Sequence, residues 1–206
     1  MSNDLVLYTN PMSRGRTIRW VLEEIGQPYR TELLDYGSTI KGADYLAINP
    51  MGKVPALKHG DTVVTEAAAI LTYLADAFPQ AGLAPAHGSA ERGAYYRWIF
   101  FAAGPLESAL IARSFGFEPQ GEQQRTAGWG SYDLALNTVE AAVAGRQFIA
   151  GDRFSAADIY LSATLGWGLQ TGGIPPRAAF TDYVAIHASR PAALRAREID
   201  DALLAG

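Results

Sequence analysis

Hydrophobic and polar residues follow one another over the first eighty positions in a pattern that predicts a small α/β domain. The apolar run Leu5–Thr9, "LVLYT", is rich in β-forming residues and precedes an Asn-Pro dipeptide, so it predicts a buried strand. Apolar residues recur at helical spacing over Ile18–Ile25, and Gly26 predicts the end of that helix. A second strand is expected within 28–36. This β-α-β order needs a crossover and therefore predicts a parallel strand pair.

Two further short β runs follow at Val54–Gly60 and Thr62–Glu66. The intervening "HGD" contains a glycine and is typical of a hairpin turn. A helix is expected to begin at Glu66 and to end before Pro79. The element order is therefore β-α-β followed by β-β-α.

The rest of the chain predicts helices only, after a linker rich in glycine, proline and alanine. A helix over 95–115 is apolar on most faces, so we expect it to be largely buried and to be kinked or broken at Pro105. The segment 156–170 is apolar nearly all round and predicts the central helix. Two shorter helices, split near Pro191, are expected at the end. The architecture is thus a small α/β domain followed by an all-helical one.

Composition excludes several classes of function. The 206 residues are 49% hydrophobic and carry a formal net charge of −4, so no basic excess exists to neutralise nucleic-acid phosphates. The absence of cysteine excludes disulfides, thiolate metal sites and thiol catalysis by the protein itself, and it is consistent with a cytoplasmic location. The N-terminal "MSNDLVLYTN" shows no secretory signal, and no apolar run is long enough for a membrane helix.

Two catalytic patterns and a metal site are disfavoured. A strand, Ser13 and a helix suggest a hydrolase nucleophile elbow, but Pro11 occupies the first glycine position of G-x-S-x-G. "GWGLQT" lacks the third glycine of a dinucleotide fingerprint. The histidines His59, His87 and His187 are scattered singly, so we expect no metal.

Three motifs carry a resemblance to a known family. They are "GKVPA" with its Val-Pro dipeptide, "TEAAAI" at the start of a helix, and "GDRFSAADIYLSA". In the last, Ser155 and Asp158 have the spacing of a helix capping box. With these three motifs in this order, the sequence resembles the cytosolic glutathione transferases, and among them the bacterial beta-like members. The resemblance implies a thioredoxin-like glutathione-binding domain at 1–80, a linker at 81–89, and an all-α domain at 90–206 that carries an electrophile pocket.

The resemblance also implies the chemistry. Such enzymes lower the pKa of the glutathione thiol, near 8.5 when free, so that the thiolate attacks an electrophile. A hydroxyl that donates to the sulfur and a helix N-terminus both favour the anion. Ser13 occupies the place where beta-like members often carry cysteine, although it can also simply cap the first helix. Tyr8 is the alternative, since alpha-like members use a tyrosine at this strand end, and the other interpretation is a packed core aromatic. Arg14 is a third candidate; its neighbours Arg16 and Arg19 are expected at the surface or in an interface.

Glutathione itself would be held by residues of three kinds. Lys53 is expected to pair with a carboxylate or to be a solvated lysine. Val54, before a cis Pro55, would pair its backbone with the cysteinyl portion as an exposed strand edge does. Glu66 would take the α-ammonium group, or only complement the helix dipole, and helix N–H groups would take the carboxylate. Ala67 stands where many members have serine, so one hydroxyl contact is lost.

The electrophile pocket would lie between the domains, lined by the aromatic candidates Tyr96, Phe100, Phe101, Phe115 and Trp167. The resemblance therefore predicts a glutathione transferase acting on apolar electrophiles in detoxification, with glutathione as co-substrate, no metal, no nucleic acid, no membrane and a homodimeric assembly. The alternatives are a non-catalytic binding or structural protein on this fold, or a glutathione-dependent isomerase, dehalogenase or peroxidase.

Overall fold

A computed structural model describes residues 4–205. The first three residues of "MSNDLVLYTN", and the outermost residues of both predicted domains, lie outside this range. Within it the chain forms two compact units, residues 4–82 with 190–205, and Leu83–Ser189. The predicted domain division follows chain order and stays a prediction, whereas packing assigns the C-terminal segment to the first unit.

The first unit is built on a four-stranded mixed sheet with the strand order β2-β1-β3-β4. Strand β1 (Leu5–Thr9) pairs in parallel with β2 (Tyr29–Leu33) and antiparallel with β3 (Ala56–His59), which pairs antiparallel with β4 (Thr62–Thr65). Both the parallel pair and the hairpin are confirmed. Since the crossover from β1 to β2 is the helix predicted from the apolar spacing, the sheet follows directly from the local pattern.

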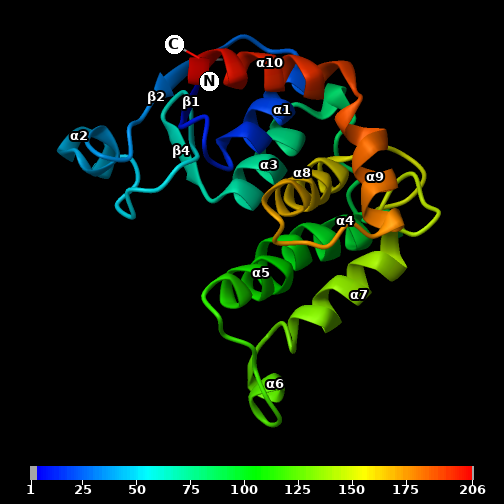
Figure 1. Cartoon of the computed structure of the whole chain (residues 1–206). Helices are drawn as coiled ribbons and strands as arrows, with labels where there is room; N and C mark the ends of the chain where they lie inside the picture. The colour runs from blue at the N-terminus through cyan, green and yellow to red at the C-terminus, as the bar shows by residue number, and fades with distance from the viewer. Residues whose placement is uncertain (1–3, 206) are drawn as a thin grey trace. The chain divides into compact units, whose positions relative to one another are not determined.

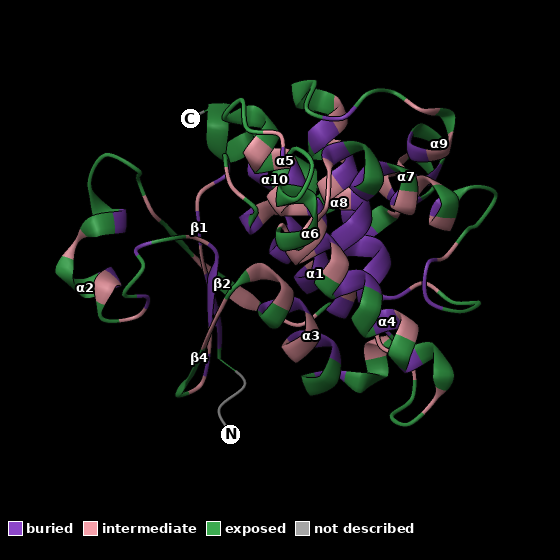
Figure 2. Cartoon of the chain, turned by 90° about the horizontal axis from the view of Figure 1, so that it is seen from below, coloured by how far each residue is buried: buried purple, intermediate pink, exposed green. Residues whose placement is uncertain are grey.

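Helices cover both faces of this sheet. Helices α1 (Gly15–Ile25) and α3 (Ala67–Ala77) lie on one face, and α2 (Ala43–Leu46), which the sequence pattern missed, lies on the other (Figures 1 and 2). The apolar stripe of α1 is fully buried and Gly26 ends the helix in the left-handed region at φ 70°. Short 3₁₀ turns η1 (Thr39–Lys41) and η2 (Pro79–Ala81) complete the connections.

The C-terminal helix α10 (Pro191–Ala205) packs along α1 (Figure 1). Arg19 of α1 is 1% exposed and donates from Nε to Asp200 of α10 at 2.8 Å, and it also reaches the Tyr29 hydroxyl at 3.1 Å. The expectation of a surface or interface position for Arg19 is therefore wrong. The guanidinium is buried because its counter-ion arrives from a helix 181 positions later in the chain.

The second unit contains only helices within the described residues. They are α4 (Ala90–Phe101), the π-helical segment η3 (Ala102–Leu106), α5 (Glu107–Ser114), α6 (Gln123–Thr126), α7 (Tyr132–Val143), α8 (Ala156–Thr171) and α9 (Ala178–Ala188). Helix α8 is buried along most of its first half, with the predicted Ser155–Asp158 capping box at its start (Figure 2). This unit agrees with the predicted all-helical region.

The helix over 95–115 departs from expectation in one respect. Pro105 interrupts it, as predicted, within the π-helical segment, because proline cannot donate the helical hydrogen bond. However, the helix is not largely buried: Phe100 is 64% exposed and Phe115 is 83% exposed. Its buried side chains Tyr95, Ile99, Ala102 and Leu106 form a single stripe, so aromatic residues also occupy the outer face. Among the helices of residues 4–205, none is long and apolar enough to cross a bilayer.

Candidate active site

The strand register brings the predicted glutathione-site residues to one edge of the sheet. Tyr8 of β1 lies opposite Ala56 of β3, and Ala56 lies opposite Thr65 of β4. Because β3 runs antiparallel to both neighbours, its beginning lies beside the ends of β1 and β4. The turn after β1, the Val54–Pro55 dipeptide before β3 and Glu66 after β4 therefore meet at this edge.

The turn that carries Ser13 is held together by Asn10. The Asn10 side chain donates to the Leu34 carbonyl at 2.8 Å and accepts from the Met12 N–H at 2.8 Å. The Asn10 carbonyl accepts from the Ser13 N–H at 3.0 Å and from the Ser13 hydroxyl at 2.6 Å. The sequence signal for this residue is the Asn-Pro dipeptide, which marks a turn as well as the end of the strand.

Ser13 both caps and precedes the first helix. Its hydroxyl oxygen accepts from the Gly15 N–H at 2.9 Å, so the serine does bond to the start of the helix. The N-cap position itself is Arg14, so Ser13 stands one residue before the N-cap and not at the N-cap itself, where a capping serine is predicted. The half-buried Ser13 side chain thus sits at the positive end of α1, where a helix favours an anion.

Gly15 fixes the approach of this helix to β1. A Cβ atom at position 15 would lie 1.7 Å from Oγ1 of Thr9, which is fully buried. Only glycine permits this contact between strand end and helix start. The exposed Arg14 side chain lies beside it on the same first turn.

Tyr8 is half-buried rather than fully exposed at the site edge. Its ring packs against the cluster formed by Ile40, Tyr45 and Ala56, and its centroid is 5.8 Å from that of Tyr45. Val54 packs on the same cluster. The Tyr8 ring is therefore packed against core residues, as expected if Tyr8 is a core aromatic residue, although it also lies beside the candidate site.

The segment before β3 is fixed by three polar side chains that sequence reasoning did not single out. The Tyr45 hydroxyl and the Asn49 amide both donate to the Lys53 carbonyl, at 2.5 and 2.8 Å, and the Lys41 ammonium donates to the carbonyls of Met51 and Gly52. Burial raises the pKa of Tyr45 to about 12. No sequence motif marks these residues, since their bonds run to backbone atoms.

Lys53 and Val54 lie just after these contacts. The Lys53 side chain is exposed, and the Val54–Pro55 peptide bond is cis. The Lys53 carbonyl is bound by Tyr45 and Asn49, whereas the Lys53 side chain with its ammonium group is exposed to solvent. The pair therefore offers a cation and a strand-edge backbone at the same corner of the sheet.

Glu66 has an unusual backbone. Its φ of 66° makes it the single non-glycine residue with positive φ in the described chain, and it immediately precedes α3. Helix α3 begins at Ala67 and has no side-chain cap, so its first N–H groups have no intrahelical or side-chain acceptor. Because strained residues cluster at ligand sites, this combination favours an anion at the helix start, beside an exposed carboxylate.

The aromatic candidates of the second unit divide into two groups. Tyr96 and Phe100 lie one turn apart on α4 with ring centroids 6.5 Å apart, whereas Phe101 packs on Trp98 at 5.5 Å. Phe115 and Trp167 are exposed, at 83% and 48%. Tyr96 and Phe100 thus form one exposed aromatic pair, and Phe101 is half-buried against Trp98.

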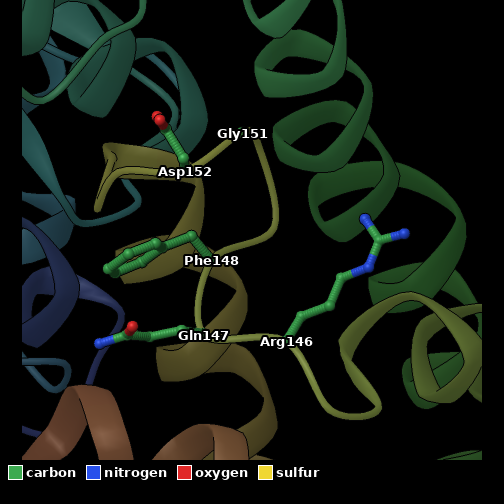
Figure 3. A pocket seen from close by; sticks show the side chains of 5 residues that line it. All are labelled: Arg146, Gln147, Phe148, Gly151 and Asp152. Carbon is green, nitrogen blue, oxygen red and sulfur yellow. The ribbon is translucent and has the colours of Figure 1, made fainter.

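A surface hollow of about 400 Å³ lies elsewhere in the second unit, lined by Arg146, Gln147, Phe148, Gly151 and Asp152. In Figure 3 the Arg146 side chain points away from those of Gln147 and Phe148. The hollow shares no residue with the predicted site, and its lining shows no convergent polar groups. In the part of the chain that the structure describes, no group of three histidine or carboxylate side chains is placed to hold a metal ion.

Comparisons with known proteins agree with this fold. The family profile "Glutathione S-transferase, N-terminal domain" matches residues 12–77, and "Glutathione S-transferase, C-terminal domain" matches residues 122–171. Glutathione S-transferase GST-4.5 of Xanthomonas campestris pv. campestris is 32% identical, over 94% of this chain and 99% of its own length.

Solved structures extend the likeness. A glutathione transferase from Methylococcus capsulatus superposes with a TM-score of 0.80 at 32% identity, over 96% of this chain and 98% of its own. A sphingomonad glutathione S-transferase complexed with glutathione gives 0.78 at 33% identity, over 95% and 98%. A thioredoxin-like unit together with an all-helical unit is the architecture of the glutathione transferases. The chain belongs to the glutathione S-transferase family.

Proposed function

We propose that this glutathione transferase activates the thiol of glutathione with the hydroxyl of Ser13 and transfers the thiolate to an apolar electrophile. The observation that carries the assignment is the position of Ser13, whose hydroxyl lies at the start of α1 beside the Val54 edge. A hydroxyl donor and the positive end of a helix both stabilise a thiolate relative to a thiol. The alternative functions are not favoured by the comparisons.

The hydroxyl proton of Ser13 has to change partner for this role, since it points to the Asn10 carbonyl oxygen at 2.6 Å. That change leaves no orphaned acceptor. The Asn10 carbonyl keeps the Ser13 N–H at 3.0 Å, and the Thr9 hydroxyl lies 3.4 Å away. Rotation of the hydroxyl toward a sulfur atom therefore exchanges one hydrogen bond for a stronger one to an anion.

Tyr8 and Arg14 take secondary places in this proposal. The Tyr8 ring is held in the Ile40–Tyr45–Ala56 cluster and shapes the wall beside the thiol. Arg14 occupies the N-cap position of α1, and its exposed guanidinium adds positive charge near the sulfur.

Glutathione binding uses the other corner of the same sheet edge. The Lys53 ammonium pairs with a carboxylate of the tripeptide, and the Val54 backbone beside the cis Pro55 pairs with its cysteinyl unit. Glu66 accepts the α-ammonium group, while the N–H groups at Ala67 and the start of α3 take the γ-glutamyl carboxylate. The glutathione complex of the sphingomonad relative supports this class of ligand.

The electrophile is apolar and meets aromatic side chains of the second unit, with Tyr96, Phe100, Phe115 and Trp167 as exposed candidates and Phe101 as a half-buried one. We further propose a homodimer that acts in the cytoplasm in detoxification, without a metal ion. The family supports these features, and gel filtration with light scattering tests the dimer.

The assignment is tested by titrating the ultraviolet absorbance of the bound thiolate in wild type, Ser13→Ala and Tyr8→Phe. We expect a thiol pKa below the free value of about 8.5 in wild type, and a rise of about one unit or more in Ser13→Ala alone. An unchanged pKa in Ser13→Ala, with a rise in Tyr8→Phe, transfers the role to Tyr8. Calorimetry that detects no glutathione binding to wild type contradicts the proposal as a whole.

A further inference from the structure

Arg16 joins the Ser13 turn to the C-terminal helix through one guanidinium group. Its Nε donates to the Pro11 carbonyl at 2.6 Å, and its Nη2 donates to Asp201 of α10 at 2.7 Å. The Arg16 side chain is 28% exposed and that of Asp201 is 56% exposed. The contact therefore links residues 185 positions apart at the rim of the candidate active site.

The contact acts on a single peptide group. The Pro11 carbonyl and the Met12 N–H belong to the same planar unit, which rotates as one body. Arg16 holds the oxygen end of this unit, and the Asn10 side chain holds the N–H end at 2.8 Å. Because this peptide directly precedes the one that carries Ser13, fixing both of its ends fixes the direction in which the Ser13 residue enters the helix.

The acidic partner of Arg16 is itself held in place. Its neighbour Asp200 forms the buried pair with Arg19, and Glu24 of α1 accepts two bonds from Arg190 at 2.6 and 2.8 Å. These contacts fasten α10 along α1. Asp201 is consequently presented to Arg16 from a helix that these contacts hold against α1.

An exposed ion pair adds at most about 1 kcal/mol to stability. In addition, aspartate has a lower helix propensity than alanine and most other residues. Asp201 is thus poorly placed as a stabilising residue of α10. Its favourable contact is the one that orients Arg16.

We propose that Arg16 is a positioning residue for thiol activation, oriented by Asp201, which holds the Pro11–Met12 peptide so that the Ser13 hydroxyl faces the glutathione sulfur. The inference rests on the proposed role of Ser13. It makes the C-terminal helix part of the support of the active site, although that helix contributes no residue that touches the substrate.

We call the contacts of Arg16 with the Pro11 carbonyl and with Asp201 the clamp, and two variants test it. Asp201→Ala removes the carboxylate, and Arg16→Lys keeps a cation that cannot reach Pro11 and Asp201 together. Glu198→Ala is the matched control, because Glu198 is an exposed acidic residue of the same helix and makes no ion pair with Arg16. Two quantities are measured: hydrogen exchange of the Ser13 amide, whose N–H is bonded to Asn10, and the pKa of the bound glutathione thiol.

In both test variants we expect Ser13 amide exchange to rise and kcat/KM to fall by about threefold each, the size that an exposed ion pair supports. The pKa of the bound thiol should rise, the KM for glutathione should stay unchanged, and thermal stability should not fall in Asp201→Ala. Glu198→Ala should match wild type in all of these. Loss of stability together with unchanged thiol pKa would show a merely structural role and overturn the proposal.

The two proposals fail in different ways. If Ser13→Ala raises the thiol pKa while Asp201→Ala and Arg16→Lys do not, the clamp is overturned and the role of Ser13 stands. If Ser13→Ala has no effect on the thiol, the role of Ser13 is overturned and with it the catalytic part of the clamp. In that case exchange of the Ser13 amide still decides whether Arg16 and Asp201 hold the turn.

Discussion

The Ser13 hydroxyl donates its proton to the Asn10 carbonyl oxygen at 2.6 Å while its oxygen accepts from the Gly15 N–H at 2.9 Å. One side chain therefore closes the turn after β1 and caps the helix that follows. Its structural and proposed chemical functions use the same atom, so a substitution affects both. Experiments on this residue need a variant that reproduces the structural loss alone.

Ser13→Ala should lower the free energy of unfolding by about 1 kcal/mol, the usual effect of losing a capping serine, in addition to its effect on the thiol. Ser131→Ala is the matched control, since Ser131 caps α7 through the Leu134 N–H at 3.1 Å. Urea denaturation should show similar losses for both variants, but only Ser13→Ala should lose transferase activity. Equal activity losses would mean that reduced stability, not chemistry, explains the effect of Ser13→Ala.

Gly15→Ala should be severely destabilising, by more than about 3 kcal/mol, because the new methyl group would overlap Oγ1 of Thr9. Combining it with Thr9→Ala should recover part of the loss, since the closest atom is removed. Gly93→Ala in α4, where the added Cβ meets nothing within 4 Å, should instead stabilise by about 0.5–1 kcal/mol. Thermal unfolding of the three variants checks these signs, and a tolerated Gly15→Ala would contradict the close approach of β1 and α1.

Asp200→Asn should cost about 3 kcal/mol or more in unfolding free energy, because the buried Arg19 guanidinium loses its counter-ion. Glu32→Gln removes the exposed partner of Arg30 and should cost less than about 1 kcal/mol. Replacing both members of the buried pair, as Arg19→Met with Asp200→Leu, should recover much of the loss. If Asp200→Asn and Glu32→Gln unfold at similar denaturant concentrations, the buried ion pair is no more important for stability than the exposed one, and the prediction is wrong.

Glu66→Gly should raise the unfolding free energy by up to about 1 kcal/mol, since glycine adopts a φ of 66° without the steric cost that glutamate bears. The same variant should bind glutathione more weakly, because the carboxylate for the α-ammonium group is lost. Glu66→Gln separates the two effects, as it keeps the backbone cost and removes the charge. Calorimetry should then show weaker binding without a gain in stability. A less stable Glu66→Gly would argue against backbone strain at this position.

The raised pKa of Tyr45 predicts that the stability of the protein falls with pH in the alkaline range. Burial raises its pKa in the folded state to about 12, above the unfolded value near 10. Its contribution to stability is therefore fully present below pH 10 and is lost as the pH rises toward 12, because the folded state retains the proton longer. Tyr45→Phe should show a shallower fall over this interval in denaturant midpoints. Tyr29, whose pKa is also raised to about 12, and Tyr132 and Tyr183, whose pKa values are raised by burial too, add to the slope. An identical slope in wild type and variant would exclude a contribution from Tyr45.

Much of the fold was predictable because its signals are local. The run Leu5–Thr9, the hairpin between β3 and β4, and the capping box at Ser155 each depend on residues a few positions apart. The edge that gathers Ser13, Val54 and Glu66 also follows from strand order. For the same reason the candidate glutathione site could be assembled from motifs, while Asn10 and Tyr45 could not, since their bonds run to distant or backbone atoms.

The sequence by itself determined the element order, the helix ends at glycine and proline, and the family-like motifs, because periodicity and hydrogen bonding over short separations encode them. Only the tertiary structure decided that Arg19 is buried against Asp200, that Arg16 reaches Asp201, and that the last helix packs in the first unit. The physical reason is desolvation: an arginine is buried only where a counter-ion arrives, and here that ion comes from the far end of the chain.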